Sequence, residues 1–210
     1  MAIIEELSEA VQAGNRKLVA ELTQKAIDEG CEPKAILDDG LVAAMTIIGD
    51  KFSRNEVFVP EMLVAARAMT AGTDVLKPFL VQAGAEPVGF AVIGTVNGDM
   101  HDIGKNLVRM MIEGKGFDVC DLGVDVKPEV FVDYIKSHPE INLVCLSALL
   151  TTTLPMIPAT IKAIEEAGLR DQVKIIIGGA PVTQEFADEA GADAYAPDAG
   201  SGSNTAVGLV

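Results

Sequence analysis

Apolar positions in residues 1–82 recur every three or four residues, which predicts amphipathic helices with one buried face. Gly14-Asn15 interrupts the first helical pattern, and the Asn15 side chain is suited to cap the next helix. Four helices with short connections are typical of a bundle. The expected helices lie before Gly14, between Asn15 and Gly30, from Pro33 to near Phe52, and from Pro60 toward Leu80.

The pattern changes after a short segment rich in Gly, Ala and Pro, residues 83–89, which we interpret as a linker. Short apolar runs then alternate with helix-like segments through residues 90–210. Alternating strands and helices imply a parallel sheet covered on both faces. We therefore predict a helical domain over 1–82 and an α/β domain over 90–210. The expected strands are Phe90–Val96, Val119–Leu122, Leu143–Ser147, Lys174–Ile177 and Ala194–Ala196.

Composition narrows the class of protein. Hydrophobic residues make up 49% of the chain, which is enough for packed cores. The formal net charge of −15 predicts repulsion from nucleic acid and from anionic membrane surfaces. No apolar run approaches the roughly 20 residues that a membrane span needs, and the N-terminus lacks the features of a signal peptide. Three isolated cysteines are typical of reduced thiols, so we expect a cytoplasmic protein.

The segment from Gly98 to Gly104, Gly-Asp-Met-His-Asp-Ile-Gly, carries the candidate chemistry. It follows the strand-like run at 90–96, at the kind of strand end where α/β sheets bind ligands. His101 is one of two histidines, and neutral imidazole is a good transition-metal ligand. Asp99 lies two residues away, close enough to hold the second ring nitrogen. The segment matches no phosphate-binding loop, and no catalytic triad or zinc motif is visible.

Residues 95–106, Thr-Val-Asn-Gly-Asp-Met-His-Asp-Ile-Gly-Lys-Asn, resemble the cobalamin-binding motif of methionine synthase and of corrinoid methyl carriers. Ser147-Ala148-Leu149 and Gly178-Gly179 follow at the spacing of that family. The resemblance covers nearly the whole chain. It implies an α + α/β fold, in which a helical cap precedes a Rossmann-like (flavodoxin-like) domain with a five-stranded parallel sheet. It also implies cobalamin, and hence cobalt, as the cofactor.

In that family a protein histidine replaces the cofactor's own dimethylbenzimidazole base as the lower cobalt ligand, and the motif places this histidine at His101. The resemblance makes Asp99 its hydrogen-bond partner. In methionine synthase a serine completes a hydrogen-bonded relay with the histidine and the aspartate. Thr153 stands at the corresponding position here, and it keeps the hydroxyl group and adds a methyl group.

The displaced nucleotide tail needs a channel beside the central strands. Glycines at strand ends and loops, namely Gly94, Gly98, Gly104, Gly178 and Gly179, permit close approach of backbone to a ring. The Ser147 hydroxyl is expected to bond the benzimidazole nitrogen. The other residues expected to bind the cofactor are Val96, Met100, Asp102, Ile103, Leu149, Thr151, Ala180, Tyr195 and Ala199.

The helical half is expected to act as a lid over the upper corrin face. Residues 49–60 resemble the cap of methionine synthase, and Phe52 and Val59 match the positions that cover the methyl group in that family. The alternative is that both side chains simply pack in the helical core. The linker at 83–89 is the natural hinge for such a lid.

The resemblance implies a corrinoid protein that is not catalytic alone and whose cobalt cycles between Co(I) and methyl-Co(III). A substrate-specific methyltransferase would load the methyl group from a methylamine, methanol, betaine or a methoxyaromatic compound. A second methyltransferase would pass it to tetrahydrofolate or coenzyme M, and a reductive activation protein would restore the cobalt. Alternatives are a cobalamin-dependent sensor, a methionine synthase-type fragment and a cobalamin-dependent isomerase subunit. The sensor alternative is disfavoured because no basic DNA-binding element is visible in the sequence.

Overall fold

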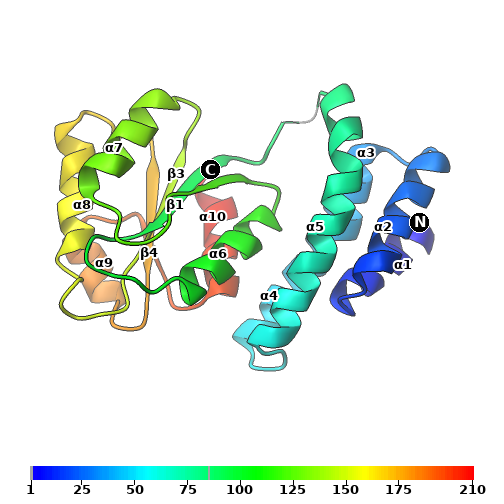
Figure 1. Cartoon of the computed structure of the whole chain (residues 1–210), viewed down its shortest axis with the longest axis horizontal. Coiled ribbons are helices and arrows are strands. Elements are labelled where there is room, and N and C mark those ends of the chain that lie inside the picture. The colour runs from blue at the N-terminus through cyan, green and yellow to red at the C-terminus, as the bar shows by residue number, and fades with distance from the viewer. Residues whose placement is uncertain (1, 85) are drawn as a thin grey trace. The chain divides into compact units, whose positions relative to one another are not determined.

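The structure is a computed structural model that describes residues 2–84 and 86–210 (Figure 1). It contains two compact units. One comprises Met1–Pro87 with Gly114–Gly116, and the other Val88–Glu113 with Phe117–Val210. Two positions of the predicted organisation, Met1 in the helical domain and Ala85 in the linker, lie outside the described residues.

The helical unit contains the predicted helices, although the third has an unexpected π-helical segment. In this segment the Ala43 amide donates to the Asp38 carbonyl, five residues earlier. The Asn15 side chain accepts a hydrogen bond from the Leu18 amide and so caps the second helix, as predicted. The helical elements are α1 (Ala2–Gln12), α2 (Arg16–Asp28), α3 (Pro33–Ala35), the π-helix η1 (Ile36–Val42), α4 (Ala43–Ser53) and α5 (Val59–Gln82).

Apolar packing holds this unit together. The buried side chains include Leu7 of α1, Val19 of α2 and Leu41 of η1. A glycine, Gly72, allows α5 to approach closely, because a Cβ there would lie 2.9 Å from the side chains of both Leu41 and Val19. Burying each Leu or Val side chain contributes about 1.5–3 kcal/mol. Helix α5 continues through Pro78 to Gln82.

The α/β unit is built on five parallel strands in the order β2-β1-β3-β4-β5, which confirms the flavodoxin-like fold class. In this order β1 lies between β2 and β3, so the chain turns to opposite sides of β1. Such a switch point is where open sheets bind ligands. The strands are β1 (Phe90–Thr95), β2 (Asp118–Asp121), β3 (Leu143–Ser147), β4 (Lys174–Gly178) and β5 (Ala194–Ala196).

Alternate strand residues pack on opposite faces of the sheet. Val92, Val144 and Ile175 pack in one core, and Ala91, Leu143 and Ile176 pack in the other. The first core includes residues of α7 (Pro128–Ser137), α8 (Met156–Glu166) and α9 (Gln184–Ala190). The second includes residues of α6 (Ile103–Glu113) and α10 (Ala199–Leu209) (Figure 1). The predicted two-sided cover is therefore confirmed.

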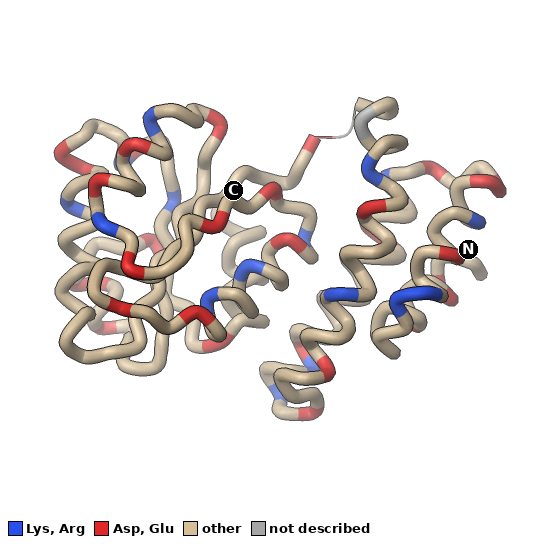
Figure 2. Tube along the Cα trace, in the orientation of Figure 1, with Lys and Arg blue, Asp and Glu red and all other residues tan. Residues whose placement is uncertain are grey.

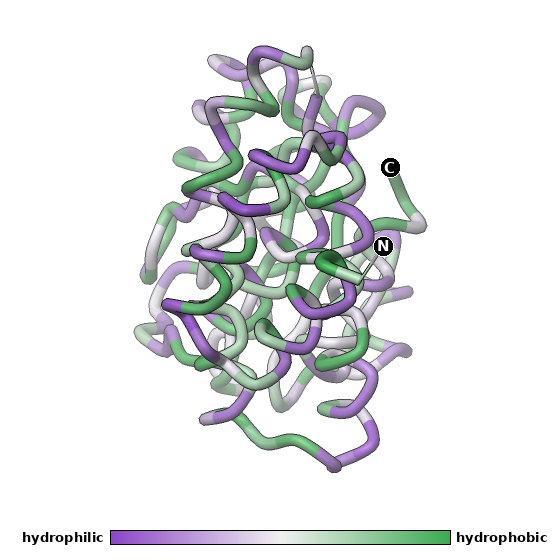
Figure 3. The backbone as a smooth tube through the Cα atoms, turned by 90° about the vertical axis from the view of Figure 1, so that its right-hand side faces the viewer, coloured by the Kyte–Doolittle hydropathy of each residue, from purple (hydrophilic) through white to green (hydrophobic). Residues whose placement is uncertain are grey.

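Acidic residues are spread along the chain of both units (Figure 2), in keeping with 31 acidic against 16 basic residues in the sequence. Hydrophobic and hydrophilic positions alternate along the helices in Figure 3, as expected for helices with a buried and a solvent-facing side. Among the described residues, no helix is long and apolar enough to cross a membrane.

Candidate functional site

The candidate site lies at the carboxyl edge of the sheet, where four strands end in register. Thr95 of β1 pairs with Ser147 of β3, Ser147 pairs with Gly178 of β4, and Gly178 pairs with Ala196 of β5. Because the strands are parallel, the loops that follow them emerge at the same edge. The first of these loops carries the Asp99–His101 pair, and the loop after β3 carries Leu149, Leu150 and Thr153.

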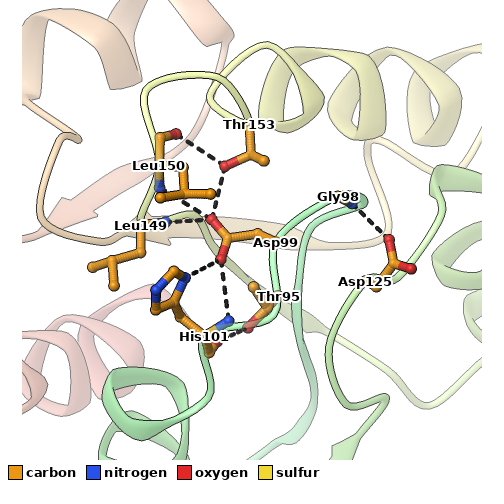
Figure 4. A network of polar contacts seen from close by, with 8 residues as sticks. All are labelled: Thr95, Gly98, Asp99, His101, Asp125, Leu149, Leu150 and Thr153. Atoms are coloured by element: carbon orange, nitrogen blue, oxygen red, sulfur yellow. Dashed lines mark hydrogen bonds and ion pairs between the residues drawn. The ribbon is translucent and has the colours of Figure 1, made fainter.

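Asp99 is fully buried and joins these two loops (Figure 4). One carboxylate oxygen, Oδ1, lies 2.7 Å from Nδ1 of His101 and accepts from the His101 amide at 3.1 Å. The other, Oδ2, accepts from the Leu149 amide at 2.7 Å, the Leu150 amide at 3.1 Å and the Thr153 hydroxyl at 2.7 Å. The structure thus brings together the three residues predicted to form the relay.

These contacts keep Asp99 ionised. Burial by itself would raise the pKa of this carboxyl group. The hydrogen bonds from the Leu149 amide, the Thr153 hydroxyl and His101 outweigh burial and hold the pKa well below its usual range. An ionised carboxylate only accepts hydrogen bonds, so Asp99 holds the His101 proton on Nδ1 when the imidazole is neutral. The lone pair of His101 then lies on Nε2.

In the part of the chain that the structure describes, Nε2 of His101 has no hydrogen-bond partner. The His101 side chain is 49% exposed, although the carboxylate that holds it is inaccessible to solvent. A ring with one nitrogen engaged by a carboxylate and the other free is the usual arrangement of a metal-binding histidine. Across the described residues, no group of three or more His, Cys, Asp or Glu is arranged to hold a metal ion. His101 would offer a metal one nitrogen ligand, which suits a metal whose other ligands belong to a macrocycle.

The His101 loop is also held by residues that the sequence interpretation did not identify as functional. The Thr95 hydroxyl donates to the His101 carbonyl at 2.8 Å. On the opposite side of the loop, an oxygen of Asp125 accepts from the Gly98 amide at 2.6 Å (Figure 4). The position of Asp125, directly after β2 and next to the switch point, was the signal that could have identified it.

The surroundings of His101 suit a large, flat, partly apolar ligand. Met100 is 68% exposed, Ile103 is 71% exposed and Leu149 is 41% exposed, and all three lie on the loops that meet at Asp99 or directly after them. Exposed apolar side chains gathered at one place indicate a binding surface. A Cβ added at Gly104 would meet no atom within 4 Å, so Gly104 leaves open space at the start of α6. The residues present therefore fit a corrin ring.

The glycines serve different purposes. Gly94 does not line a channel, because a Cβ there would lie 2.6 Å from Cζ of the buried Phe131, so the suggestion that it lines the cofactor channel is wrong. Gly179 has a φ of +130°, and a Cβ there would lie 1.8 Å from the Ala148 carbonyl oxygen. The fold itself therefore requires glycine at 179. A Cβ at Gly178 would lie 3.0 Å from the Ala196 carbonyl oxygen.

The remaining predicted residues occupy the same edge or its approaches. Ser147 ends β3, and within the described part of the chain its hydroxyl makes no hydrogen bond, which leaves it available to a ligand. The Val96 amide donates to the Ser147 carbonyl at 3.0 Å, and Asp102 accepts from the Asn106 side chain at 3.2 Å. Thr151 and Ala180 are exposed on loops, Tyr195 is half-buried in β5, and Ala199 is buried at the start of α10.

Phe52 and Val59 lie in the helical unit. Phe52 is half-buried near the end of α4, and Val59 is half-buried at the start of α5. Their predicted role over the methyl group stays a prediction. His138, the second histidine, stacks on Tyr134 with ring centroids 4.0 Å apart at the end of α7.

Known proteins share this architecture. Residues 89–209 match the B12 binding domain, and residues 3–77 match a second family described as a B12 binding domain. The dimethylamine corrinoid protein of Methanosarcina barkeri is 42% identical over 200 residues, which cover 94% of this chain and 92% of that protein.

Two solved structures extend the comparison. A cobalamin-binding protein from Desulfitobacterium hafniense is 31% identical with a TM-score of 0.83, covering 99% of this chain and 98% of that one. A chain of the methanol:cobalamin methyltransferase complex of Methanosarcina barkeri is 28% identical with a TM-score of 0.85 and covers 99% of this chain and 79% of that one.

Proposed function

We propose that this chain, which belongs to the B12-binding domain family, is a corrinoid protein that carries a methyl group on cobalt between two methyltransferases. Its cofactor is cobalamin, a cobalt corrinoid. When bound, the cobalt supplies a centre that takes up a methyl group and gives it up again. The observation that carries the proposal is the His101 imidazole, held by Asp99 at Nδ1 and open at Nε2.

In this proposal His101 would hold the cobalt of the cofactor through Nε2. Asp99 orients the ring and keeps the proton on Nδ1, and Thr153 and the Leu149 and Leu150 amides keep Asp99 ionised. The chain's own part would therefore be to present one ring nitrogen to the metal while Asp99 holds the opposite ring nitrogen.

The nucleotide tail is assigned to the edge formed by β3 and β4. Ser147 is the last residue of β3, its hydroxyl has no protein partner among the described residues, and it is suited to bond a ring nitrogen. Gly178 leaves its side of β4 without a side chain. Thr151, Ala180, Tyr195 and Ala199 are the further residues that we assign to this channel.

The partners are methyltransferases. The dimethylamine corrinoid protein favours a methylamine as the methyl donor, and the methanol:cobalamin methyltransferase complex favours direct docking of a donor-specific methyltransferase. A second methyltransferase with tetrahydrofolate or coenzyme M as acceptor, a reductive activation protein and a cytoplasmic location complete the proposal. Similarity to corrinoid proteins over nearly their whole length favours this role over the sensor, isomerase subunit and methionine synthase-fragment alternatives.

Reconstitution with hydroxocobalamin, beside His101→Ala, tests the proposal. We expect one cofactor per chain and, in the Co(II) state, electron paramagnetic resonance splitting from one imidazole nitrogen. His101→Ala should fold normally, because the side chain is half exposed, and should lose that splitting. A folded wild-type protein that takes up no cobalamin, or splitting that persists in the variant, would contradict the proposal. Methyl transfer from dimethylamine, with the matching methyltransferase added, then tests the donor.

A further inference from the structure

We infer that Asp125 is a positioning residue, which clamps the loop Asn97–Asp99 and thereby sets where His101 presents Nε2 to cobalt. This inference rests on the proposed function. Asp125 follows β2 in the sequence, whereas Asp99 and His101 follow β1, so the clamp joins two strand ends that only the sheet brings together. It lies on the side of the loop opposite the Leu149–Thr153 contacts (Figure 4).

Three hydrogen bonds form the clamp. The Asp125 oxygen Oδ1 accepts from the Gly98 amide and from the Asn97 side-chain amide, both at 2.6 Å. The Asp125 amide donates to the Asp99 carbonyl at 2.9 Å. Hydrogen bonds to a charged acceptor are shorter and stronger than neutral ones. Asp125 therefore contacts three consecutive residues, the last of which holds the His101 ring.

The backbone at this point is unusual. Asp125 has a φ of +54°, and Asn55 is the one other non-glycine residue with positive φ among residues 2–84 and 86–210. Gly98, its partner, also has a positive φ, of +83°. A left-handed conformation is costly for residues other than glycine, although Asp and Asn tolerate it better than most. Such conformations persist where surrounding contacts hold them, and here the contacts are those to the His101 loop.

The clamp complements the Asp99 network. The contacts from Leu149, Leu150 and Thr153 hold the carboxylate of Asp99, but they do not hold the backbone from which it extends. Asp125 holds that backbone at the Gly98 amide and the Asp99 carbonyl. A ligand held from both sides has its nitrogen fixed in position, and loss of such outer support typically reduces metal affinity about 10–100-fold.

Two substitutions distinguish the hydrogen bonds of the Asp125 side chain from the backbone conformation of Asp125. Asp125→Gly removes the acceptor and keeps the positive φ at no cost, whereas Asp125→Asn keeps an acceptor oxygen and tolerates the same φ. Asp125→Asn is therefore the matched control for Asp125→Gly. Denaturation curves of both variants verify folding.

The first measurement is amide hydrogen exchange at Gly98 in the apoprotein. We expect at least about tenfold faster exchange in Asp125→Gly, with near wild-type exchange in Asp125→Asn. The second is the Co(II) nitrogen splitting of the loaded protein, where Asp125→Gly should lose most of the imidazole-ligated population and Asp125→Asn should restore it. Unchanged exchange overturns the clamp, and faster exchange with unchanged ligation overturns its role in positioning His101. Failure of the wild type to bind cobalamin would instead overturn the proposed function, and the apoprotein exchange would still test the clamp.

Discussion

The loops after β1 and β4 lie at the same edge of one sheet, yet they are shaped by opposite means. The loop after β1 is held by polar side chains that come from distant parts of the chain, with Asp99 contacting Thr153 and Asp125 contacting Gly98. The loop after β4 is shaped by the lack of a side chain, because Gly179 passes against the Ala148 carbonyl. Neither loop conformation follows from its own residues alone.

The comparison shows that residues of the same cofactor-binding motifs can be required for different reasons. Gly179 is required so that the fold can form, whereas His101 is half exposed and is needed for a ligand. Asp99 belongs to both classes, because it is buried and also holds His101. Substitutions that separate stability from cofactor binding therefore test the assignment, and they are given below from the largest expected change in stability to the smallest.

Gly179→Ala should have the largest effect on stability. The added methyl group would meet the Ala148 backbone at a φ of +130°, which combines a steric clash with backbone strain and costs about 3–5 kcal/mol. Gly191→Ala is the control, since Gly191 has a φ of +77° but nothing within 4 Å, and it should cost only about 1–2 kcal/mol. Urea denaturation of both apoproteins measures the difference, and equal losses would show that the Ala148 contact is unimportant.

Asp99→Asn should reduce both stability and cobalt ligation. The side-chain NH2 group that replaces one carboxylate oxygen cannot accept hydrogen bonds, so buried donors lose their partner. We expect this to lower the free energy of unfolding by about 2–4 kcal/mol at neutral pH and to weaken cobalt ligation by His101 about 10–100-fold. Because the pKa of Asp99 is lowered by folding, its contribution to stability is complete above the usual aspartate pKa and is lost as pH falls through the folded pKa.

The stability difference between wild type and Asp99→Asn should therefore be large at about pH 7 and smaller at about pH 3. Urea denaturation of the apoproteins at both values measures it. A difference that grows toward acid would contradict the assigned direction of the Asp99 pKa shift.

Thr153→Val should cost less, about 1–2 kcal/mol, because the two side chains have the same shape and only the hydroxyl contacts, to Asp99 at 2.7 Å and to the Leu150 carbonyl at 2.9 Å, are lost. Thr153→Ser is the matched control that keeps the donor. We expect Ser to match wild type in the Co(II) nitrogen splitting and Val to show a reduced imidazole-ligated population. Equal spectra for Val and Ser would remove Thr153 from the relay.

Gly104→Ala should separate stability from binding most cleanly. Gly104 lies in the first turn of α6, and a Cβ there meets nothing within 4 Å. Alanine should therefore stabilise the helix by about 0.5–1 kcal/mol. The same methyl group would occupy space assigned to the corrin, so cobalamin uptake should fall. Thermal denaturation of the apoprotein and titration with hydroxocobalamin measure the two effects. Unchanged uptake would show that Gly104 does not line the cofactor site.

Much of the fold was predictable because its signals are local. The apolar runs that became β3 and β5 were predicted with their observed ends, and Asn15 caps α2 as expected. The π-helical segment at 36–42 was not predicted, because seven residues within a longer helical pattern are too few to show a change of hydrophobic period. Gly94 was misassigned to a channel, because a glycine in a strand has the same sequence signal whether a ligand or Phe131 fills the space beside it.

For this protein, the sequence alone determined the two-part organisation, the alternation of strands and helices, and the presence of Asp99 and His101 two residues apart after a strand. Those features depend on residues that are close to one another in the sequence. Only the tertiary structure decided that the Leu149 and Leu150 amides hold Asp99, that Asp125 holds Gly98, and that Gly179 is structural. The reason is that the parallel sheet sets which strand ends are neighbours, and it brings Asp99 against Thr153, 54 positions later in the sequence.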